Sequence, residues 1–247
     1  MQMISDFSLP VVVALGVWAF IMINVPILGW MYGEGGIKAG ISLGVLAQAA
    51  TVSLLLLLRT ADGFNPLILA AIPVYGLLIE VIGSRTGVPF GDYRYTDELK
   101  PQILHVPVVI PLAWLMMIPP SWGIAAALAP EGSPVIQALI AGAAFMAWDL
   151  FLDPQMTRWN YWRWARPGGY FGIPWLNFFG WFLTAAIVTL LLRPTNLPVP
   201  PLVIIYLVTW FLQSVGQIVF WKMVGPGLVG SAVMGALAWS AAALVLF

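Results

Sequence analysis

Three carboxylic acids lie within or beside strongly apolar stretches of this sequence. Glu80 stands near the end of one stretch, and Asp149 and Asp153 stand four residues apart near the end of another. An ionisable side chain inside a membrane is energetically costly, so its presence indicates a function. A spacing of four residues places both aspartates on one face of a helix. Two poorly solvated carboxyl groups cannot ionise independently, so one of them stays protonated and becomes a candidate general acid.

Each acid also has a purely structural interpretation. Asp153, at or just past the end of its predicted helix, can cap a turn or pair with Arg158, and Glu80 can pair with Arg85. Ion-pair networks of this kind are a common reason for an unusual charged residue. Asp149 lies in the last predicted turn of its helix and has no basic residue within a helical turn. It is therefore the strongest candidate of the three.

Two other polar residues stand in apolar surroundings. Asn177 lies inside a predicted helix, where its amide either serves a site or binds the backbone of a neighbouring helix. His105 is expected at the start of a predicted helix, near the membrane interface. A lone interfacial histidine has many structural roles, so we favour a satisfied polar residue over a catalyst.

The composition is that of an integral membrane protein. Of the 247 residues, 61% are hydrophobic and only 8% are charged, against about 25% charged in soluble domains. The net charge is zero, so no basic field indicates a nucleic-acid partner. There is no cysteine and only one histidine, which excludes disulfides, thiolate sites and a multi-histidine metal site within one chain.

Apolar stretches of about 20 residues, the length that crosses the hydrocarbon core, recur along the whole chain. They predict an all-α, polytopic membrane bundle of about eight transmembrane helices in a single domain, 1–247. The first stretch is too long and unbroken for a cleavable signal peptide. The predicted spans are 9–30, 37–58, 66–83, 103–120, 134–152, 175–192, 199–220 and 225–246.

The distribution of Lys and Arg predicts the orientation of the bundle. Loops after odd-numbered helices hold Lys38, Arg85, Arg94, Lys100, Arg158, Arg163, Arg166 and Lys222, whereas the other side holds Arg59 and Arg193. Cytoplasmic loops carry the excess of positive charge. We therefore expect a multi-pass protein of the cell membrane with both termini outside. The two long polar loops, 84–102 and 153–174, should then both be cytoplasmic.

Several motifs occur in order between residues 76 and 182, and together they resemble one family. The motifs are Glu80-x-x-Gly83-x-x-x-Gly87-x-Pro89-Phe90-Gly91-x-Tyr93-x-Tyr95, Val106-Pro107-x-x-Ile110-Pro111-x-x-Trp114, Asp149-x-x-x-Asp153-Pro154 and Gly169-Tyr170-x-Gly172-Ile173-Pro174-x-x-Asn177-Phe178-x-Gly180-Trp181. The chain is similar to the membrane carotenoid biosynthesis family that includes hydratases of the bisanhydrobacterioruberin and gamma-carotene type. The remaining helices match only in being apolar.

The resemblance implies a cofactor-independent carotenoid hydratase, a lyase acting on a lycopene derivative or similar isoprenoid. Such an enzyme adds water across the terminal C1–C2 double bond of an acyclic carotenoid end. An acid protonates the less substituted alkene carbon, and water captures the tertiary cation. The implied partners are a carotenoid dissolved in the lipid bilayer and other carotenoid enzymes. The sequence independently lacks a dinucleotide-binding glycine motif after a strand.

This chemistry assigns roles to the residues of the motifs. We expect Asp149 or Glu80 to be the acid, with Asp153 polarising it or positioning water. Aromatic faces stabilise a desolvated cation by about 2 kcal/mol or more. The candidates for orienting water are Tyr93, Tyr95 and Asn177, those for the cation-facing wall are Trp114 and Trp181, and further substrate contacts are expected from Phe90, Tyr170, Phe171 and Trp175.

Three other functions share parts of this pattern. A carotenoid end cyclase begins with the same protonation, but an internal alkene captures the cation instead of water. An intramembrane prenyltransferase holds magnesium and diphosphate with Asp-rich motifs, whereas only the pair Asp149 and Asp153 is present here. A lipid or pigment transporter or binding scaffold would not depend on a carboxylate. Product analysis, magnesium chelation and carboxylate substitution distinguish these three from a hydratase.

Overall fold

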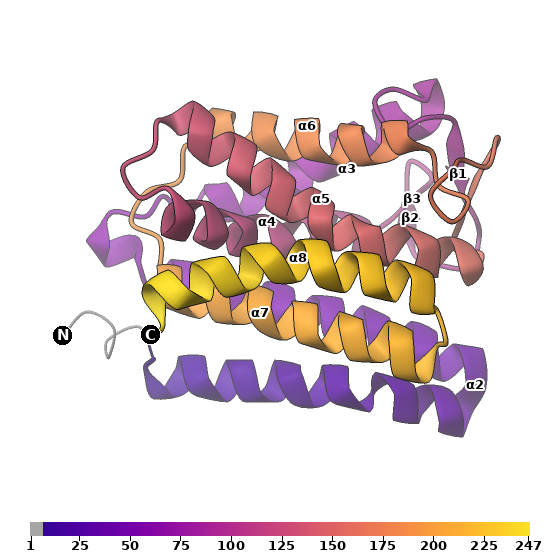
Figure 1. The fold of residues 1–247 in the computed structure, drawn as a ribbon, viewed down its shortest axis with the longest axis horizontal. Coiled ribbons are helices and arrows are strands. Elements are labelled where there is room, and N and C mark those ends of the chain that lie inside the picture. The colour runs from indigo at the N-terminus through magenta and orange to yellow at the C-terminus, as the bar shows by residue number, and fades with distance from the viewer. Residues whose placement is uncertain (1–6) are drawn as a thin grey trace.

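The computed structural model describes residues 7–247, which form a bundle of long helices with short strands at one end (Figure 1). Seven of these helices are long and apolar enough to cross a membrane, judged by length and composition. In chain order the main helices are α2 (Leu9–Leu57), α3 (Ile68–Thr86), α4 (Val109–Leu128), α5 (Pro134–Arg158), α6 (Trp175–Leu192), α7 (Val199–Val215) and α8 (Val224–Val245), with the short 3-10 helix η1 (Thr60–Asp62) and the π-helix η2 (Gly216–Phe220) between them.

Helix α2 is a helical hairpin, because the backbone leaves helical geometry at Gly33 (φ 62°, ψ −146°). A positive φ is readily adopted only by glycine. The two arms, 9–32 and 34–57, then run side by side. The Thr51 hydroxyl donates to the Ala14 carbonyl oxygen (3.3 Å), and Gly44 lies against Met22. The arms account for the first two predicted spans, so the helical bundle predicted from the sequence is confirmed.

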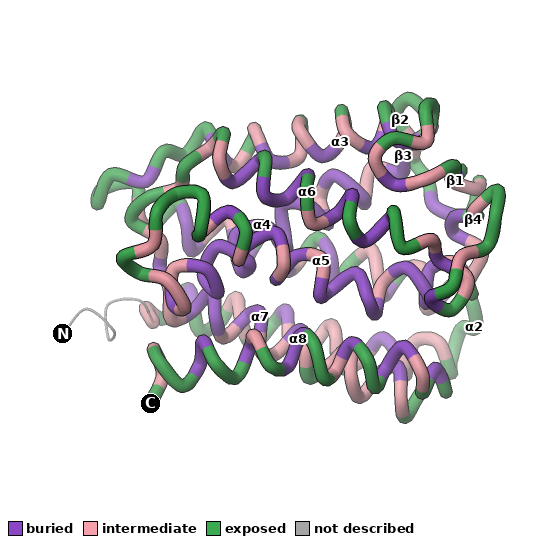
Figure 2. The backbone as a smooth tube through the Cα atoms, turned by 45° about the horizontal axis from the view of Figure 1, so that its top comes forward, coloured by how far each residue is buried: buried purple, intermediate pink, exposed green. Residues whose placement is uncertain are grey.

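Helix α4 is the central helix, and 16 of its 20 residues are buried. It contacts α2, α3, α5, α7 and α8, and the buried core follows it through the bundle (Figure 2). The second arm of α2 is attached to α4 through a carbonyl oxygen that a proline leaves without its helical donor. Pro120 cannot donate to the Met116 carbonyl as a helical residue normally would, and the Gln48 side-chain amide donates to that oxygen instead (3.2 Å).

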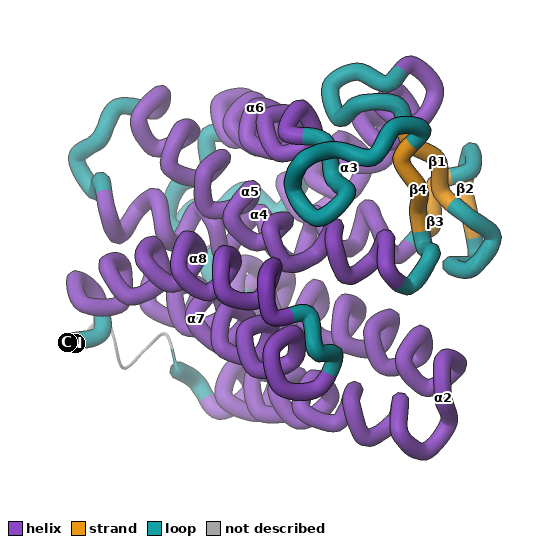
Figure 3. The backbone as a smooth tube through the Cα atoms, turned by 45° about the vertical axis from the view of Figure 1, so that its right-hand side comes forward, coloured by secondary structure: helices purple, strands orange, loops and turns teal. Residues whose placement is uncertain are grey.

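The two long polar loops meet at one end of the bundle (Figure 3). Strand β1 (Tyr93–Tyr95) pairs antiparallel with β4 (Trp162–Trp164), with Arg94 opposite Arg163. Strands β2 (Gln102–Ile103) and β3 (Val106–Pro107) form a separate two-stranded sheet, a β-hairpin. The predicted common side of loops 84–102 and 153–174 is therefore present in the structure.

Two predicted boundaries are wrong. The fourth spanning helix begins at Val109 rather than at residue 103, because the β2–β3 hairpin occupies the preceding segment. His105 consequently lies in the tight turn of that hairpin, with a φ of 71°, and does not start a helix. At the other boundary, α5 continues through Pro154 to Arg158, so Asp149 and Asp153 both lie inside the helix.

The pairing of β1 with β4 can be tested by cross-linking, because the natural chain has no cysteine. Directly opposed residues in an antiparallel pair have Cβ atoms about 5 Å apart. The double variant Arg94→Cys, Arg163→Cys should therefore cross-link within the chain on mild oxidation or with a short bismaleimide, detected by mass spectrometry of peptides. The control Arg94→Cys, Glu131→Cys places its cysteines at opposite ends of the bundle and should not react. Equal yields in the two variants would contradict this fold.

Candidate active site

Glu80 is bound by three hydrogen-bond donors at the loop end of the bundle. The Tyr93 and Tyr95 hydroxyls both donate to its Oε2 atom, at 2.5 and 2.7 Å. The Trp114 indole N–H donates to its Oε1 atom (3.2 Å). Residues two apart on a strand share a face, which explains how both tyrosines of β1 reach the same oxygen. Gly76 allows Trp114 to pack closely, since a Cβ there would lie 2.7 Å from the indole Cγ.

Asp149 and Asp153 are joined by Asn177 of α6. The Asn177 amide nitrogen donates to Asp149 Oδ2 (2.8 Å) and also to Asp153 Oδ2. The Trp181 N–H donates to Asn177 Oδ1 (3.1 Å), which fixes the direction of the amide. The Trp162 N–H donates to Asp153 Oδ1 (2.9 Å). Because one amide nitrogen binds both carboxyl groups, the two acids lie side by side, an arrangement that suits a pair sharing one proton.

The helix that carries this pair is completed by a loop residue. Pro154 leaves the carbonyl of Leu150 without its helical donor. The Tyr170 hydroxyl donates to that oxygen (3.1 Å). The loop before α6 therefore stabilises the turn of α5 that holds both aspartates.

The structural ion pairs considered for these acids are not formed in residues 7–247. Glu80 is bound by phenol and indole groups rather than by Arg85. Asp153 is bound by Trp162 and Asn177, while the Arg158 guanidinium donates to the Trp221 carbonyl. The acids are thus held by neutral donors and have no cation to balance a full set of negative charges.

These groups surround a small chamber of about 20 Å³. A cavity of about 10–15 Å³ or more can hold one water molecule when polar partners surround it. Half of the lining residues are aromatic. Behind the wall, the Trp114 ring stacks on the Trp181 ring with centroids 5.3 Å apart. The residues that line the chamber are Glu80, Phe90, Tyr93, Tyr95, Ile110, Ala113, Leu152, Asp153, Trp162, Trp164, Asn177 and Trp181.

Asp149 is buried but does not line the chamber. Its Oδ1 atom has no hydrogen-bond partner among residues 7–247, and its other oxygen faces Asn177. Asp153 is the member of the pair that reaches the chamber. A proton shared by the pair would consequently be delivered through Asp153.

The sequence-based reasoning missed two residues of the site, Trp162 and Trp164 of β4. Trp162 donates to Asp153, and both rings line the chamber. The signal was the alternation Trp162-x-Trp164, which matches Tyr93-x-Tyr95 in the other loop. A period of two indicates a strand with both aromatic rings on one face.

The structure does not bring three of the expected substrate-contact residues to the chamber. Tyr170 packs with Leu150, Ile173 and Phe178 in a separate cluster. Phe171 and Trp175 are 52% and 63% exposed. The cause is that the loop folds back on itself, with bridges between Gly168 and Gly172 and between Tyr170 and Ile173. The other nine expected site residues lie in or directly behind the chamber.

Both phenols that bind Glu80 resist ionisation. Burial raises the pKa of the Tyr93 hydroxyl well above its ordinary value of 10.0, and the negative Glu80 raises it further. Burial likewise raises the pKa of the Tyr95 hydroxyl well above 10.0, again with Glu80 as the second cause. These groups therefore remain hydrogen-bond donors over the whole physiological pH range.

Comparison with known proteins gives two matches. The family described as "Carotenoid biosynthesis protein" matches residues 39–238 of this chain. The chain is also 31% identical over 128 residues to a bisanhydrobacterioruberin hydratase of Haloarcula japonica. That similarity covers 51% of this chain but only 43% of the relative, so the chain matches less than half of the relative's length. No solved structure is significantly similar to the chain.

The raised pKa values predict a loss of stability at alkaline pH. Above a pH of about 10 the phenols ionise in the unfolded protein, whereas Tyr93 and Tyr95 of the folded protein keep their protons. The free energy of unfolding therefore falls as the pH rises above the pKa of the unfolded phenols. The slope is on the order of 1.4 kcal/mol per pH unit for each phenol. Thermal unfolding in detergent between pH 8 and 11, a range set around the phenol value of about 10, should show this decline.

The same titration of the double variant Tyr93→Phe, Tyr95→Phe should give a flatter alkaline limb. The control Tyr32→Phe removes an exposed phenol and should keep the wild-type slope. Identical slopes for all three proteins would show that the two phenols are not held protonated by the site.

Proposed function

Because the chain belongs to the carotenoid biosynthesis protein family, we propose that it is a carotenoid hydratase that adds water across the terminal C1–C2 double bond of an acyclic carotenoid end. The observation that carries the proposal is the chamber itself. It combines a pair of aspartates joined by one amide, a glutamate bound by three donors, aromatic side chains in the wall and space for about one water molecule.

In the first step the aspartate pair supplies the proton. The shared proton leaves Asp153 and bonds to the less substituted alkene carbon, while the π electrons form the new C–H bond. The positive charge then rests on the tertiary carbon. The faces of Phe90, Trp164 and Trp181 stabilise this cation, with each desolvated cation–π contact contributing about 2 kcal/mol.

In the second step a water molecule donates a lone pair to the tertiary carbon and forms the C–O bond. Glu80 accepts the proton that this water loses, which yields the tertiary alcohol. Return of that proton to the aspartate pair restores the starting state, so no external oxidant or reductant is needed. Glu80 suits this role because its hydrogen-bond partners are all donors, as a carboxylate requires.

A carotenoid end cyclase is the second candidate, since it begins with the same protonation. The space for water beside Glu80 and Asp153 favours hydration over cyclisation. The two functions differ in the product, because a cyclase leaves the mass of the carotenoid unchanged whereas a hydratase adds the mass of one water for each modified end.

Expression in a lycopene-producing host, followed by mass spectrometry of the pigments, tests the carboxylates. Glu80→Gln, Asp149→Asn and Asp153→Asn keep the size of each side chain and one acceptor oxygen but cannot exchange a proton. Each should lower the hydration rate by ~100-fold or more, in line with general acid–base contributions. Asp97→Asn alters an exposed acid and should leave the rate unchanged. Near-normal product from the three folded site variants would refute the carboxylate mechanism.

We further propose that the chamber end of the bundle faces the cytoplasm of the cell, because loops at that end hold most of the Lys and Arg. Single-cysteine variants test this orientation with a membrane-impermeant maleimide on intact cells. Glu131→Cys, at the opposite end, should be labelled, and Arg94→Cys should be labelled only after the cells are opened. The reverse pattern would invert the topology.

A further inference from the structure

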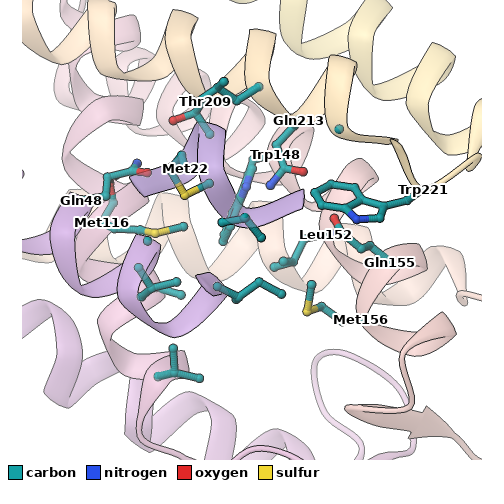
Figure 4. A pocket seen from close by; sticks show the side chains of 18 of the residues that line it. Met22, Gln48, Met116, Trp148, Leu152, Gln155, Met156, Thr209, Gln213 and Trp221 are labelled. Atoms are coloured by element: carbon teal, nitrogen blue, oxygen red, sulfur yellow. Dashed lines mark hydrogen bonds between the residues drawn. The ribbon is translucent and has the colours of Figure 1, made fainter. Parts of the chain in front are cut away.

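A second and much larger cavity of about 360 Å³ adjoins the chamber. Side chains from α2, α4, α5 and α7 point into it (Figure 4). Its wall and the wall of the chamber share four residues, so the two spaces are neighbours. The shared residues are Ile110, Ala113, Leu152 and Trp162.

The wall of this cavity is almost entirely apolar. Met22, Val45, Met116 and Leu152 contribute hydrocarbon or thioether groups. Some of the polar groups in the wall are already engaged, since the Thr209 hydroxyl donates to the Ile205 carbonyl. Within the part of the chain that the structure describes, Trp148 Nε1 and Gln213 Oε1 have no hydrogen-bond partner. Such a wall suits a hydrocarbon that carries at most a few oxygen groups.

The cavity reaches the outer surface of the bundle between the first arm of α2 and α7. Three of its lining residues, Ile23, Phe211 and Phe220, are 57%, 56% and 54% exposed. In a membrane, an apolar surface of a spanning bundle at this position faces lipid. Helix α7 also ends here in the π-helix η2, whose residues Gly216 and Phe220 form part of the wall; π-helical turns occur frequently at functional sites.

We propose that this cavity binds the polyene body of the substrate, which enters sideways from the bilayer between α2 and α7. The proposal rests on the proposed function for the identity of the polyene. The reacting end stops at Ala113 and Leu152, where the terminal alkene faces the water site and Asp153 of the chamber, while the rest of the chain lies in the cavity. A cavity of this size holds about one drug-sized molecule, so the far part of a long carotenoid projects through the opening into lipid.

This arrangement explains why the acids stand at one end of the bundle. The terminal alkene lies near the loops, where water and protons are available, and the insoluble chain extends toward the middle of the membrane. The same geometry makes the enzyme selective for the end group rather than for the total length of the chain. The far end would remain in lipid and would make no contact with the protein.

Binding can be measured without turnover. Purified wild-type protein in lipid nanodiscs is titrated with lycopene, and quenching of tryptophan fluorescence is followed, since Trp148 and Trp221 line the cavity. Val45→Phe and Leu212→Trp enlarge wall residues on two different helices and should weaken lycopene binding by ~10-fold or more, as overpacking typically does. Leu43→Phe makes a matched change at an exposed position outside the wall and should bind as the wild type does.

A second measurement distinguishes a blocked cavity from a variant that folds poorly or that affects binding indirectly. Hydration of a short acyclic monoterpene alkene, which occupies only the part of the cavity beside the chamber, should persist in Val45→Phe while hydration of lycopene falls. Unchanged lycopene affinity in both wall variants, or an equal loss in Leu43→Phe, would overturn the cavity proposal. Binding that responds as expected in a protein that never hydrates would retain the cavity and refute the hydratase function instead.

Discussion

Three carboxyl groups buried in an apolar bundle are the constraint on which the rest of this structure depends. Glu80, Asp149 and Asp153 are at most 2% exposed, and a buried polar group is costly unless it is hydrogen-bonded. The partners of Glu80 and Asp153 come largely from the two long loops, through Tyr93, Tyr95 and Trp162. The pairing of β1 with β4 is therefore what holds the donors over the acids, and the site exists only when both loops are folded together.

Two prolines within the helices allow side chains of other segments to form hydrogen bonds with the helices around this site. Each proline frees a carbonyl oxygen one turn earlier, and in two places a distant side chain donates to it. Tyr170 binds the carbonyl freed by Pro154 beside the aspartates, and Gln48 binds the one freed by Pro120 in the wall-forming helix α4. The first bond attaches the second loop to the acidic helix, and the other attaches the α2 hairpin that closes the large cavity.

The sequence predicted the spans and the family correctly because both depend on local signals. Long apolar stretches are visible in composition, and the motifs around Glu80 and Asn177 occur in order along the chain. The β1–β4 ladder was not predicted, because it joins three-residue strands that lie almost 70 positions apart. The exposure of Phe171 and Trp175 could not be predicted either, because the aromatic character of a residue does not show which way its loop folds. The end of α5 was misplaced because no local pattern indicates that the hydroxyl of Tyr170 replaces the donor missing at Pro154.

In the proposed mechanism, one solvent-derived proton and the hydroxyl group of one water molecule are added to the same carotenoid end beside a carboxylate-lined chamber. Isotope labelling tests it most directly. Purified protein in nanodiscs is given lycopene in D₂O and, separately, in water enriched in ¹⁸O, and the product is examined by mass spectrometry. Hydration predicts a tertiary alcohol that carries solvent oxygen and one carbon-bound deuterium for each modified end. A product with deuterium but no solvent oxygen would indicate cyclisation, and a product with neither label would contradict the acid-catalysed mechanism altogether.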